Sequence, residues 1–285
     1  FTKKFEELFG TPRGAKEELT QYHKDLAKSV QTATEDVIFH MANHLQKATG
    51  SKNICIAGGV AQNSVANGKI IANTDFDNLY IPSAGHDAGI SMGSALYHYN
   101  QTLDFPRAGE QKSASTGSHF NNDEIEAYLK SKGVSYKKME DAELYDYISD
   151  KLIVPSVVGW YQGRAEFGPR ALGNRSIIAD PRNEKAKELL NLKIKRRESF
   201  RPFAPSILKE YVGEYFEYDS NVPFMEKVFP IKKEKHKEIP AVTHVDGTGR
   251  LQSVDKVVSP RYYNLIEAFR QKTGVPILLN TSFNE

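Results

Sequence analysis

The sequence has a single cysteine and no long apolar run. Cys55 cannot form an internal disulfide, and it stands in the apolar stretch 53–57, where we expect a small buried side chain. This favours a reducing compartment, so we expect a cytoplasmic protein. No stretch approaches the ~20 consecutive apolar residues of a membrane helix, and no basic segment followed by an apolar signal core opens the chain. We therefore expect no membrane insertion.

The chain also lacks a strong excess of charge of either sign. Its 38 Lys and Arg oppose 36 Asp and Glu, which leaves a net charge of +2. Nucleic-acid binding normally needs a concentrated basic face, so this balance argues against a nucleic-acid partner. The 39% hydrophobic and 26% charged residues are typical of globular proteins, and 285 residues suffice for two domains.

The first hundred residues alternate helix and strand signals. Apolar residues recur every three or four positions from Leu19 to Leu45, which predicts a long amphipathic helix that ends at Gly50. Each strand expected after it leads into a glycine loop and a helix, the arrangement in which α/β folds bind ligands. The expected strands are 53–57 and 79–82, and the expected helices are 62–73 and 90–97.

A stretch rich in Pro, Gly and Ser near residues 100–118 is typical of a linker. We therefore expect domains at 1–105 and 119–285, with a linker at 106–118. The second domain is expected to be α/β with a mixed sheet. Its expected helices begin near 122 and at 141 and cover 184–196 and 262–272, and its expected strands cover 157–161, 204–208, 241–245, 251–254 and 275–279.

Cationic side chains gather beside glycines and prolines at the ends of these expected strands. Arginine presents a planar fork that matches phosphate or carboxylate oxygens, and glycine lets backbone amides approach an anion. Held in one cleft, these groups would bind a polyanion. The alternative is that each arginine forms a surface salt bridge with a nearby carboxylate, which is the commoner outcome for a single arginine. The nearby carboxylates are Glu166, Asp180, Glu198 and Asp246.

Four motifs together resemble the O-carbamoyltransferase family of nodulation and antibiotic biosynthesis. They are GRAEFGPRALGNRS at 163–176, RPFAP at 201–205, HVDGT at 244–248 and NTSFN at 280–284. The first is long enough to be specific, and the resemblance spans nearly the whole chain. It implies a fragment that lacks the N-terminal half of the first domain and the extreme C-terminus.

The resemblance implies the C-terminal part of an actin- and sugar-kinase-like carbamoyl-transfer domain, followed by a domain that resembles threonylcarbamoyl-adenylate synthases and has a mixed twisted sheet. The second domain would form carbamoyl-adenylate from carbamoyl phosphate and ATP, with Mg²⁺ on the nucleotide. The first would transfer the carbamoyl group to a hydroxyl of a sugar-like small molecule or oligosaccharide. Self-association of the chain is left open.

The resemblance also assigns site residues in the second domain. Its activation-site ligands correspond to Arg170, Lys195, Arg201, Asn280 and Ser282. Arg170 and Arg201 would clamp phosphate and carbamoyl oxygens, while Lys195 would neutralise charge at the attacked phosphorus. Asn280 and Ser282 would hydrogen-bond the carbamoyl group. Further phosphate contacts are expected from Arg175 and Arg250, and alternatives to Lys195 are Lys193, Arg196 and Arg197.

The glycine loops of the first domain carry two further predictions. Gly58 and Gly59 resemble a nucleotide-binding loop of the actin-like superfamily, although a tight strand-to-helix turn explains them equally well. Asp87 in GHDAG at 85–89 is a metal candidate, and the resemblance implies an iron-type centre completed by histidines outside this chain. His40 and His44 share a helix face, but ordinary helix positions explain this spacing better.

Two other functions remain open at this point. An actin-like phosphotransferase of the sugar-kinase class would account for both glycine loops but not for the loop that carries Arg170. A non-catalytic nucleotide- or RNA-binding module would bind RNA in a salt-sensitive way. Carbamate formation that depends on carbamoyl phosphate would separate the transferase from both.

Overall fold

A computed structural model describes residues 2–14, 16–107, 109–154, 156–198 and 200–283. The chain divides into two compact units, residues 1–50 and 51–285, and each is described by itself. The linker predicted at 106–118 lies within the second unit, and its described residues form no helix or strand. None of the described helices combines the length and the apolar composition that crossing a membrane requires.

The first unit contains the short helix α1 (Lys3–Phe9) and the long helix α2 (Gln21–Thr49). The predicted amphipathic helix is confirmed, and Gly50 ends it in the left-handed conformation with φ of 66°. Within this unit, its apolar stripe is largely exposed, as Val37 and Met41 show. The periodicity therefore predicted the helix correctly, although the stripe is not buried within the unit.

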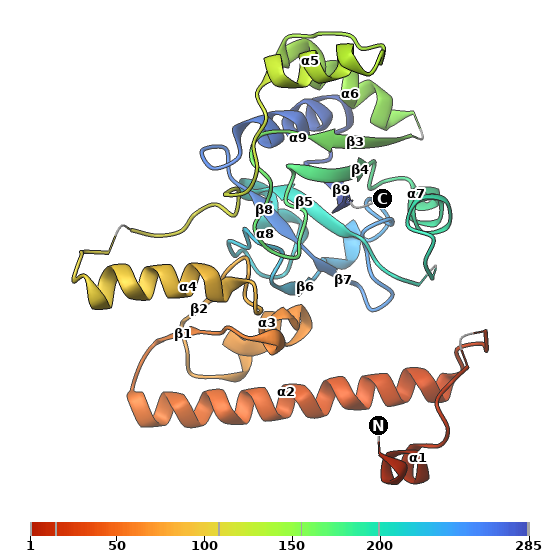
Figure 1. Cartoon of the computed structure of the whole chain (residues 1–285). Coiled ribbons are helices and arrows are strands. Elements are labelled where there is room, and N and C mark those ends of the chain that lie inside the picture. Colours follow the sequence, from red (N-terminus) through yellow and green to blue (C-terminus); the bar gives the residue numbers. More distant parts are fainter. Residues whose placement is uncertain (1, 15, 108, 155, 199, 284–285) are drawn as a thin grey trace. The chain divides into compact units, whose positions relative to one another are not determined.

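The second unit begins with a two-stranded parallel sheet of β1 (Asn53–Cys55) and β2 (Asn78–Tyr80) (Figure 1). Ile54 is buried, whereas Cys55 on the opposite face is exposed. The prediction of a buried Cys55 is wrong, because only one face of this short sheet is covered. The helices here are α3 (Ser64–Asn73), α4 (Gly89–Tyr97) and the π-helical turn His98–Thr102.

A five-stranded sheet of order β3-β4-β9-β5-β8 lies at the centre of the remaining part of the second unit (Figure 1). Its β5–β8 pair is parallel, and its other neighbouring pairs are antiparallel. The predicted α/β class with a mixed sheet is therefore confirmed. The strands are β3 (Val157–Tyr161), β4 (Arg175–Ala179), β9 (Ile277–Ser282), β5 (Ala204–Leu208) and β8 (Gln252–Val254).

The helices of this part begin close to where the sequence predicts. Asn121 caps α5, because its side chain accepts the Glu124 N–H while the Glu124 carboxylate accepts the Asn121 N–H. The helix predicted over 184–196 is shorter and continues as a π-helical turn, Leu190–Ile194. The helices are α5 (Asn122–Ser131), α6 (Asp141–Ile153), α7 (Glu184–Leu189), α8 (Val212–Tyr215) and α9 (Pro260–Thr273).

One predicted strand is wrong. Residues 241–245 form turns, and the extended segment follows as β7 (Thr248–Arg250), which pairs with β6 (Val228–Pro230). Ala241 and Val242 are buried, but Val245 is 98% exposed, so the apolar letters there do not share one face of a sheet. The sequence also did not predict β4 or β6.

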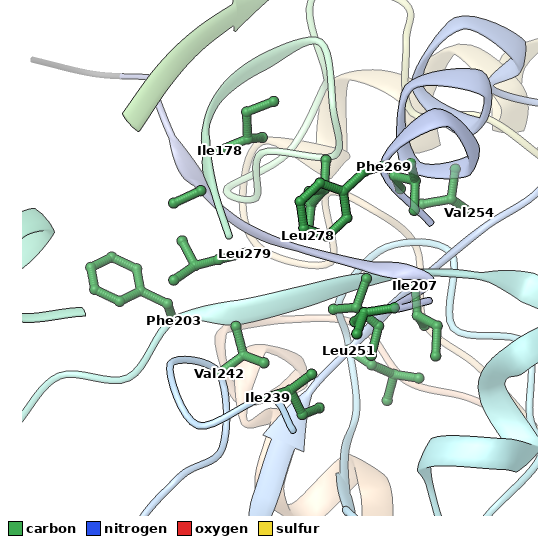
Figure 2. Packing of buried hydrophobic residues seen from close by; sticks show 14 of the residues in the cluster. Ile178, Phe203, Ile207, Ile239, Val242, Leu251, Val254, Phe269, Leu278 and Leu279 are labelled. Atoms are coloured by element: carbon green, nitrogen blue, oxygen red, sulfur yellow. The ribbon is translucent and has the colours of Figure 1, made fainter. Parts of the chain in front are cut away.

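Buried apolar side chains from both faces of the five-stranded sheet form the main core (Figure 2). Ile178, Ile207 and Leu278 project from β4, β5 and β9, and Phe269 of α9 packs in the same cluster. Close packing of such side chains opposes relative movement of the strands. The core thus fixes the strand ends from which the polar loops extend.

Candidate functional site

The loop between β3 and β4 is organised around one carboxylate. Glu166 Oε1 accepts the backbone N–H groups of Leu172 at 2.8 Å, Asn174 at 2.8 Å and Arg175 at 3.2 Å. Glu166 therefore acts as an internal anion that folds the loop around itself. The sequence offered Glu166 only as a salt-bridge partner of an arginine, because spacing does not show that backbone donors converge on it.

Arg175 holds the same loop from its other side. Its guanidinium donates to the carbonyls of Gln162 at 2.6 Å and Gly163 at 3.1 Å, and it lies over the Tyr161 ring at 3.6 Å. It also donates to the Ser118 carbonyl at 3.2 Å, which ties in the end of the predicted linker. These contacts support a structural role, and a phosphate contact by Arg175 stays a prediction.

Two glycines allow the loop to pack closely against its surroundings. Gly168 has φ of +140°, and a Cβ there would lie 2.4 Å from the Ser83 carbonyl oxygen. Gly173 has φ of +100°, and a Cβ there would lie 2.2 Å from the Tyr262 ring. A larger residue at either position would meet both backbone strain and a steric clash.

Asn280 of β9 holds the loop at Ala171, the residue that follows Arg170. Asn280 is 1% exposed, and its side-chain amide donates to the Ala171 carbonyl at 3.1 Å and to Ser206 Oγ at 3.0 Å. Its Oδ1 is buried without a hydrogen-bond partner in the described part of the chain. A hydrogen bond from Asn280 to a carbamoyl group therefore stays a prediction, since its observed contacts position the loop.

Arg170 and Arg250 are two partly buried cations of this unit that act on each other. Both are half-buried, and within the described part of the chain neither guanidinium has a hydrogen bond or an ion pair. Burial lowers the pKa of Arg170. Burial, then the positive charges of Arg170 and Arg197, lower the pKa of Arg250 to about 9. Two partly desolvated cations therefore repel each other, and no acidic side chain among the described residues pairs with either of them.

The basic run 193–197 contributes to the same region. Arg197 acts on Arg250, donates to Asn191 Oδ1 at 2.9 Å and lies over the Phe203 ring at 5.0 Å. Lys195 is half-buried and donates to the Ser282 carbonyl at 2.6 Å and to Ser282 Oγ at 3.3 Å. The structure therefore brings the predicted residues Lys195 and Ser282 together, while Arg197 is the member of the run that lies near Arg250.

Arg201 is placed differently from Arg170. It is exposed, and its Nε donates to Glu198 Oε2 at 2.9 Å. This is the surface ion pair that the sequence left open as the alternative. A substrate contact by Arg201 stays a prediction and would require this pair to exchange for a ligand.

His244 lies within the field of Arg250, and it was not predicted from the sequence as a site residue. Its Nδ1 lies 3.1 Å from Thr248 Oγ1, in the turn that precedes β7 and Arg250. Burial lowers the pKa of His244 to about 4, while Asp246 opposes and Arg250 assists this shift. The HVDGT motif was the available signal, because it places the histidine six positions before Arg250.

The low pKa of His244 predicts a loss of stability in acid. Below its ordinary pKa of 6.5 the unfolded chain binds a proton that the folded chain excludes down to about pH 4. Between these values the free energy of unfolding should fall by up to about 3 kcal/mol through this group. Urea unfolding across this range should show a weaker pH dependence for His244→Gln than for the wild type.

The matched control is His98→Gln, because His98 is exposed. Its pH dependence should equal that of the wild type. Equal slopes for His244→Gln and the wild type would contradict the assignment.

The glycine loops at residues 58–59 and 85–89, both in the second unit, contact each other. The Gly58 N–H donates to the Gly85 carbonyl at 2.6 Å, and Gly58 has φ of +96°. Ala61 and Gln62, which follow Gly59, line a cavity of about 10 Å³ together with Arg170. This cavity has room for about one water molecule, so it does not itself hold a substrate. Nucleotide binding by Gly58 and Gly59 stays a prediction.

Asp87 does not form a metal site with the residues around it. Its side chain is exposed, and its neighbour His86 uses Nδ1 to accept the Ala88 N–H at 3.2 Å. The described residues contain no group of three or more His, Cys, Asp and Glu side chains that could hold a metal ion. We therefore assign no chemical step to a metal here, and a shared centre completed by other residues stays a prediction.

Comparison with known proteins covers both parts of the chain. The family model described as carbamoyltransferase C-terminus matches residues 149–285, and the model described as carbamoyltransferase N-terminus matches residues 1–96. Of the motifs quoted above, only Asn284 falls outside the described residues.

Several curated proteins are similar over almost the whole chain. An uncharacterized protein of Synechocystis sp., sll1178, is 44% identical and aligns with 99% of this chain and 50% of its own length. Nodulation protein NolO of Bradyrhizobium diazoefficiens is 42% identical over 93% of this chain and 49% of its own. Nodulation protein NolNO of Sinorhizobium fredii is also 42% identical, over 93% and 40%. The chain thus spans about half the length of these relatives or less.

Proposed function

Because the chain belongs to the carbamoyltransferase family, we propose that the cluster of Arg170, Arg197 and Arg250 binds the phosphates of carbamoyl phosphate and ATP. The chain would then carry the activation step of a carbamoyl transfer to a hydroxyl group. It would do so within a longer protein, since it spans about half of its relatives.

The observation that carries this proposal is the absence of an anion beside Arg170 and Arg250 in the described part of the chain. A buried charge without a partner is costly, and the cost is removed when an anion binds. Arginine is suited to this task because its planar fork makes two parallel bonds to phosphate oxygens. Glu166, Gly168 and Asn280 support the proposal by fixing the backbone that presents Arg170.

The proposed reaction has two chemical steps. Water releases phosphate from carbamoyl phosphate and leaves carbamate. A carbamate oxygen then attacks the α-phosphorus of ATP. The bond between that phosphorus and the α,β-bridging oxygen breaks, pyrophosphate departs, and carbamoyl-adenylate is formed. Fixed cations suit such a step, because catalysis of phosphoryl-type transfer relies on positioning and on charge stabilisation. Mg²⁺ bound to ATP would offset part of the triphosphate charge.

Lys195 and Ser282 contribute further substrate contacts in this proposal. Their mutual hydrogen bonds place an ammonium and a hydroxyl at the end of β9. If Lys195 and Ser282 exchanged these hydrogen bonds for bonds to carbamoyl or phosphate oxygens, both residues would take their predicted roles.

The proposal also includes the finer description of the fold, an actin-like part followed by a part that resembles threonylcarbamoyl-adenylate synthases. It further includes a sugar-like acceptor and an iron-type metal at Asp87.

The products formed from ATP test the proposal. Incubation of the chain with ATP, Mg²⁺ and carbamoyl phosphate should release pyrophosphate and an AMP product only when carbamoyl phosphate is present. Arg250→Met should abolish this release, whereas Lys233→Met, a change at an exposed lysine, should not. Formation of ADP would instead support a phosphotransferase, and pyrophosphate release without carbamoyl phosphate would contradict the proposed substrate.

A further inference from the structure

A second and much larger cavity lies within residues 51–285. Its volume is about 870 Å³, and small-molecule sites commonly measure about 300–1,000 Å³. Its wall is formed by α3 and β2, by residues 110–115 and by the segment 217–229. Ile81, Phe224 and Glu226 also line the small cavity beside Arg170, so the two spaces share one wall.

Lys227 is the side chain of this wall that most clearly points to a ligand. It is 8% exposed and lines the large cavity. Within the described part of the chain, no group makes a hydrogen bond or an ion pair with its ammonium, and the charge of Glu226 acts on it only through its field. Burial lowers the pKa of Lys227, as expected for a desolvated cation. An oxygen anion of a ligand would remove this cost.

The rest of the lining limits the charge of that ligand. Lys209 is already paired with Asp255 at 2.7 Å. In total, six carboxylates and only three lysines line the cavity. This excess of negative charge would repel a polyanion such as a nucleotide much more strongly than a ligand with one negative charge. The carboxylates belong to Asp77, Glu110, Glu217, Asp219, Glu226 and Asp255, and the lysines are Lys112, Lys209 and Lys227.

Other parts of the lining fit hydroxyl groups and a ring. Glu217 and Asp219 are exposed, and neither carboxylate makes an ion pair among the residues that the structure describes, so both can accept hydrogen bonds from ligand hydroxyls. Tyr218 and Phe229 lie with their ring centroids 5.1 Å apart and add an apolar surface beside these acceptors. Tyr80 contributes a further phenol from β2.

We propose that this cavity binds a polyhydroxylated ring with one carboxylate, of the sugar-acid class, and that Lys227 receives the carboxylate. The site is separate from the one proposed for carbamoyl phosphate and ATP, because none of its charged groups belongs to the cluster of Arg170, Arg197 and Arg250. The proposal rests on the unpaired ammonium of the largely buried Lys227, together with the size and charge of the cavity that this residue lines.

Calorimetric titration with glucuronate tests this assignment. Wild-type protein should bind glucuronate at least about tenfold more tightly than glucose or acetate, because only glucuronate has both the ring hydroxyls and the carboxylate. Lys227→Met should lose that preference without a fall in melting temperature, because the change removes an unpaired buried charge. Lys233→Met is the matched control and should bind like the wild type.

A second variant keeps the test decisive if Lys227→Met does not fold. Ala72→Trp places a large side chain from the exposed face of α3 into the cavity and leaves Lys227 in place. It should also abolish glucuronate binding. No binding by the wild type, unchanged binding by both variants, or tighter binding of the dianion glucose 6-phosphate would each overturn the proposal.

Discussion

Replacing Arg170 with alanine should weaken carbamoyl phosphate binding by about 100-fold, because removal of one partner from a desolvated charge pair typically costs about 2–5 kcal/mol. The same change should not lower the free energy of unfolding, since Arg170 is half-buried and has no partner within the described part of the chain. Calorimetric titration and urea unfolding measure the two effects on one preparation. Opposite responses of affinity and stability are characteristic of a residue kept for binding.

Arg201→Ala provides the control for this change. Arg201 is exposed and paired with Glu198, and such surface pairs contribute about 0–1 kcal/mol. We expect at most a small effect on stability, so Arg201→Ala controls for the loss of a surface charge, and its affinity shows whether Arg201 keeps this pair or contacts the substrate. A loss of affinity in Arg201→Ala as large as in Arg170→Ala would show that Arg201 leaves Glu198 to clamp the substrate. A large loss of stability in Arg170→Ala would instead indicate a structural role for Arg170.

Replacing Glu166 with alanine should have the largest effect on folding. The change leaves the N–H groups of Leu172, Asn174 and Arg175 without their acceptor. A buried donor without a partner costs about 1–3 kcal/mol, so the free energy of unfolding should fall by at least about 3 kcal/mol. Anion affinity should fall as well, because the loop that carries Arg170 loses its internal anchor. Urea unfolding gives the first value and calorimetry the second.

Glu198→Ala is the matched control for Glu166→Ala. Glu198 is also a carboxylate near a basic segment, but it lies on the exposed surface beside Arg201. Its removal should change the free energy of unfolding by no more than about 1 kcal/mol. A cost below about 1 kcal/mol for Glu166→Ala would contradict the view that this carboxylate organises the loop.

Local patterns in the sequence predicted several elements well. The stripe from Leu19 to Leu45 and Gly50 gave α2 and its end, and Asn121 with Glu124 gave the start of α5. These signals succeed because periodicity and capping depend on residues within a few positions of one another. The mixed α/β class followed from the alternation of such segments.

Features that depend on distant contacts could not be predicted in this way. Asn280 and Ser282 were expected after a strand that ended at Leu279, but they lie within β9, because this strand continues to pair with Ser176 and Ile178 of β4. Pairing between segments about a hundred positions apart leaves no local signal in either segment.

The candidate site shows the same limit. Sequence reasoning selected Arg170 and Arg250 as cations but could not show that they lie within each other's field, or that Arg201 pairs with Glu198. It treated the carboxylate of Glu166 as a salt-bridge partner, whereas its observed partners are backbone N–H groups. Residue types indicate chemistry, but burial and convergence decide which of them remain available to a ligand.

The most direct test of the central claim is a crystal structure of this chain with carbamoyl phosphate. We expect density for the ligand with its phosphate oxygens within hydrogen-bonding distance of both the Arg170 and the Arg250 guanidinium groups. Density for the ligand elsewhere, with Arg170 and Arg250 still unpaired, would contradict the assignment of this cluster as the anion site.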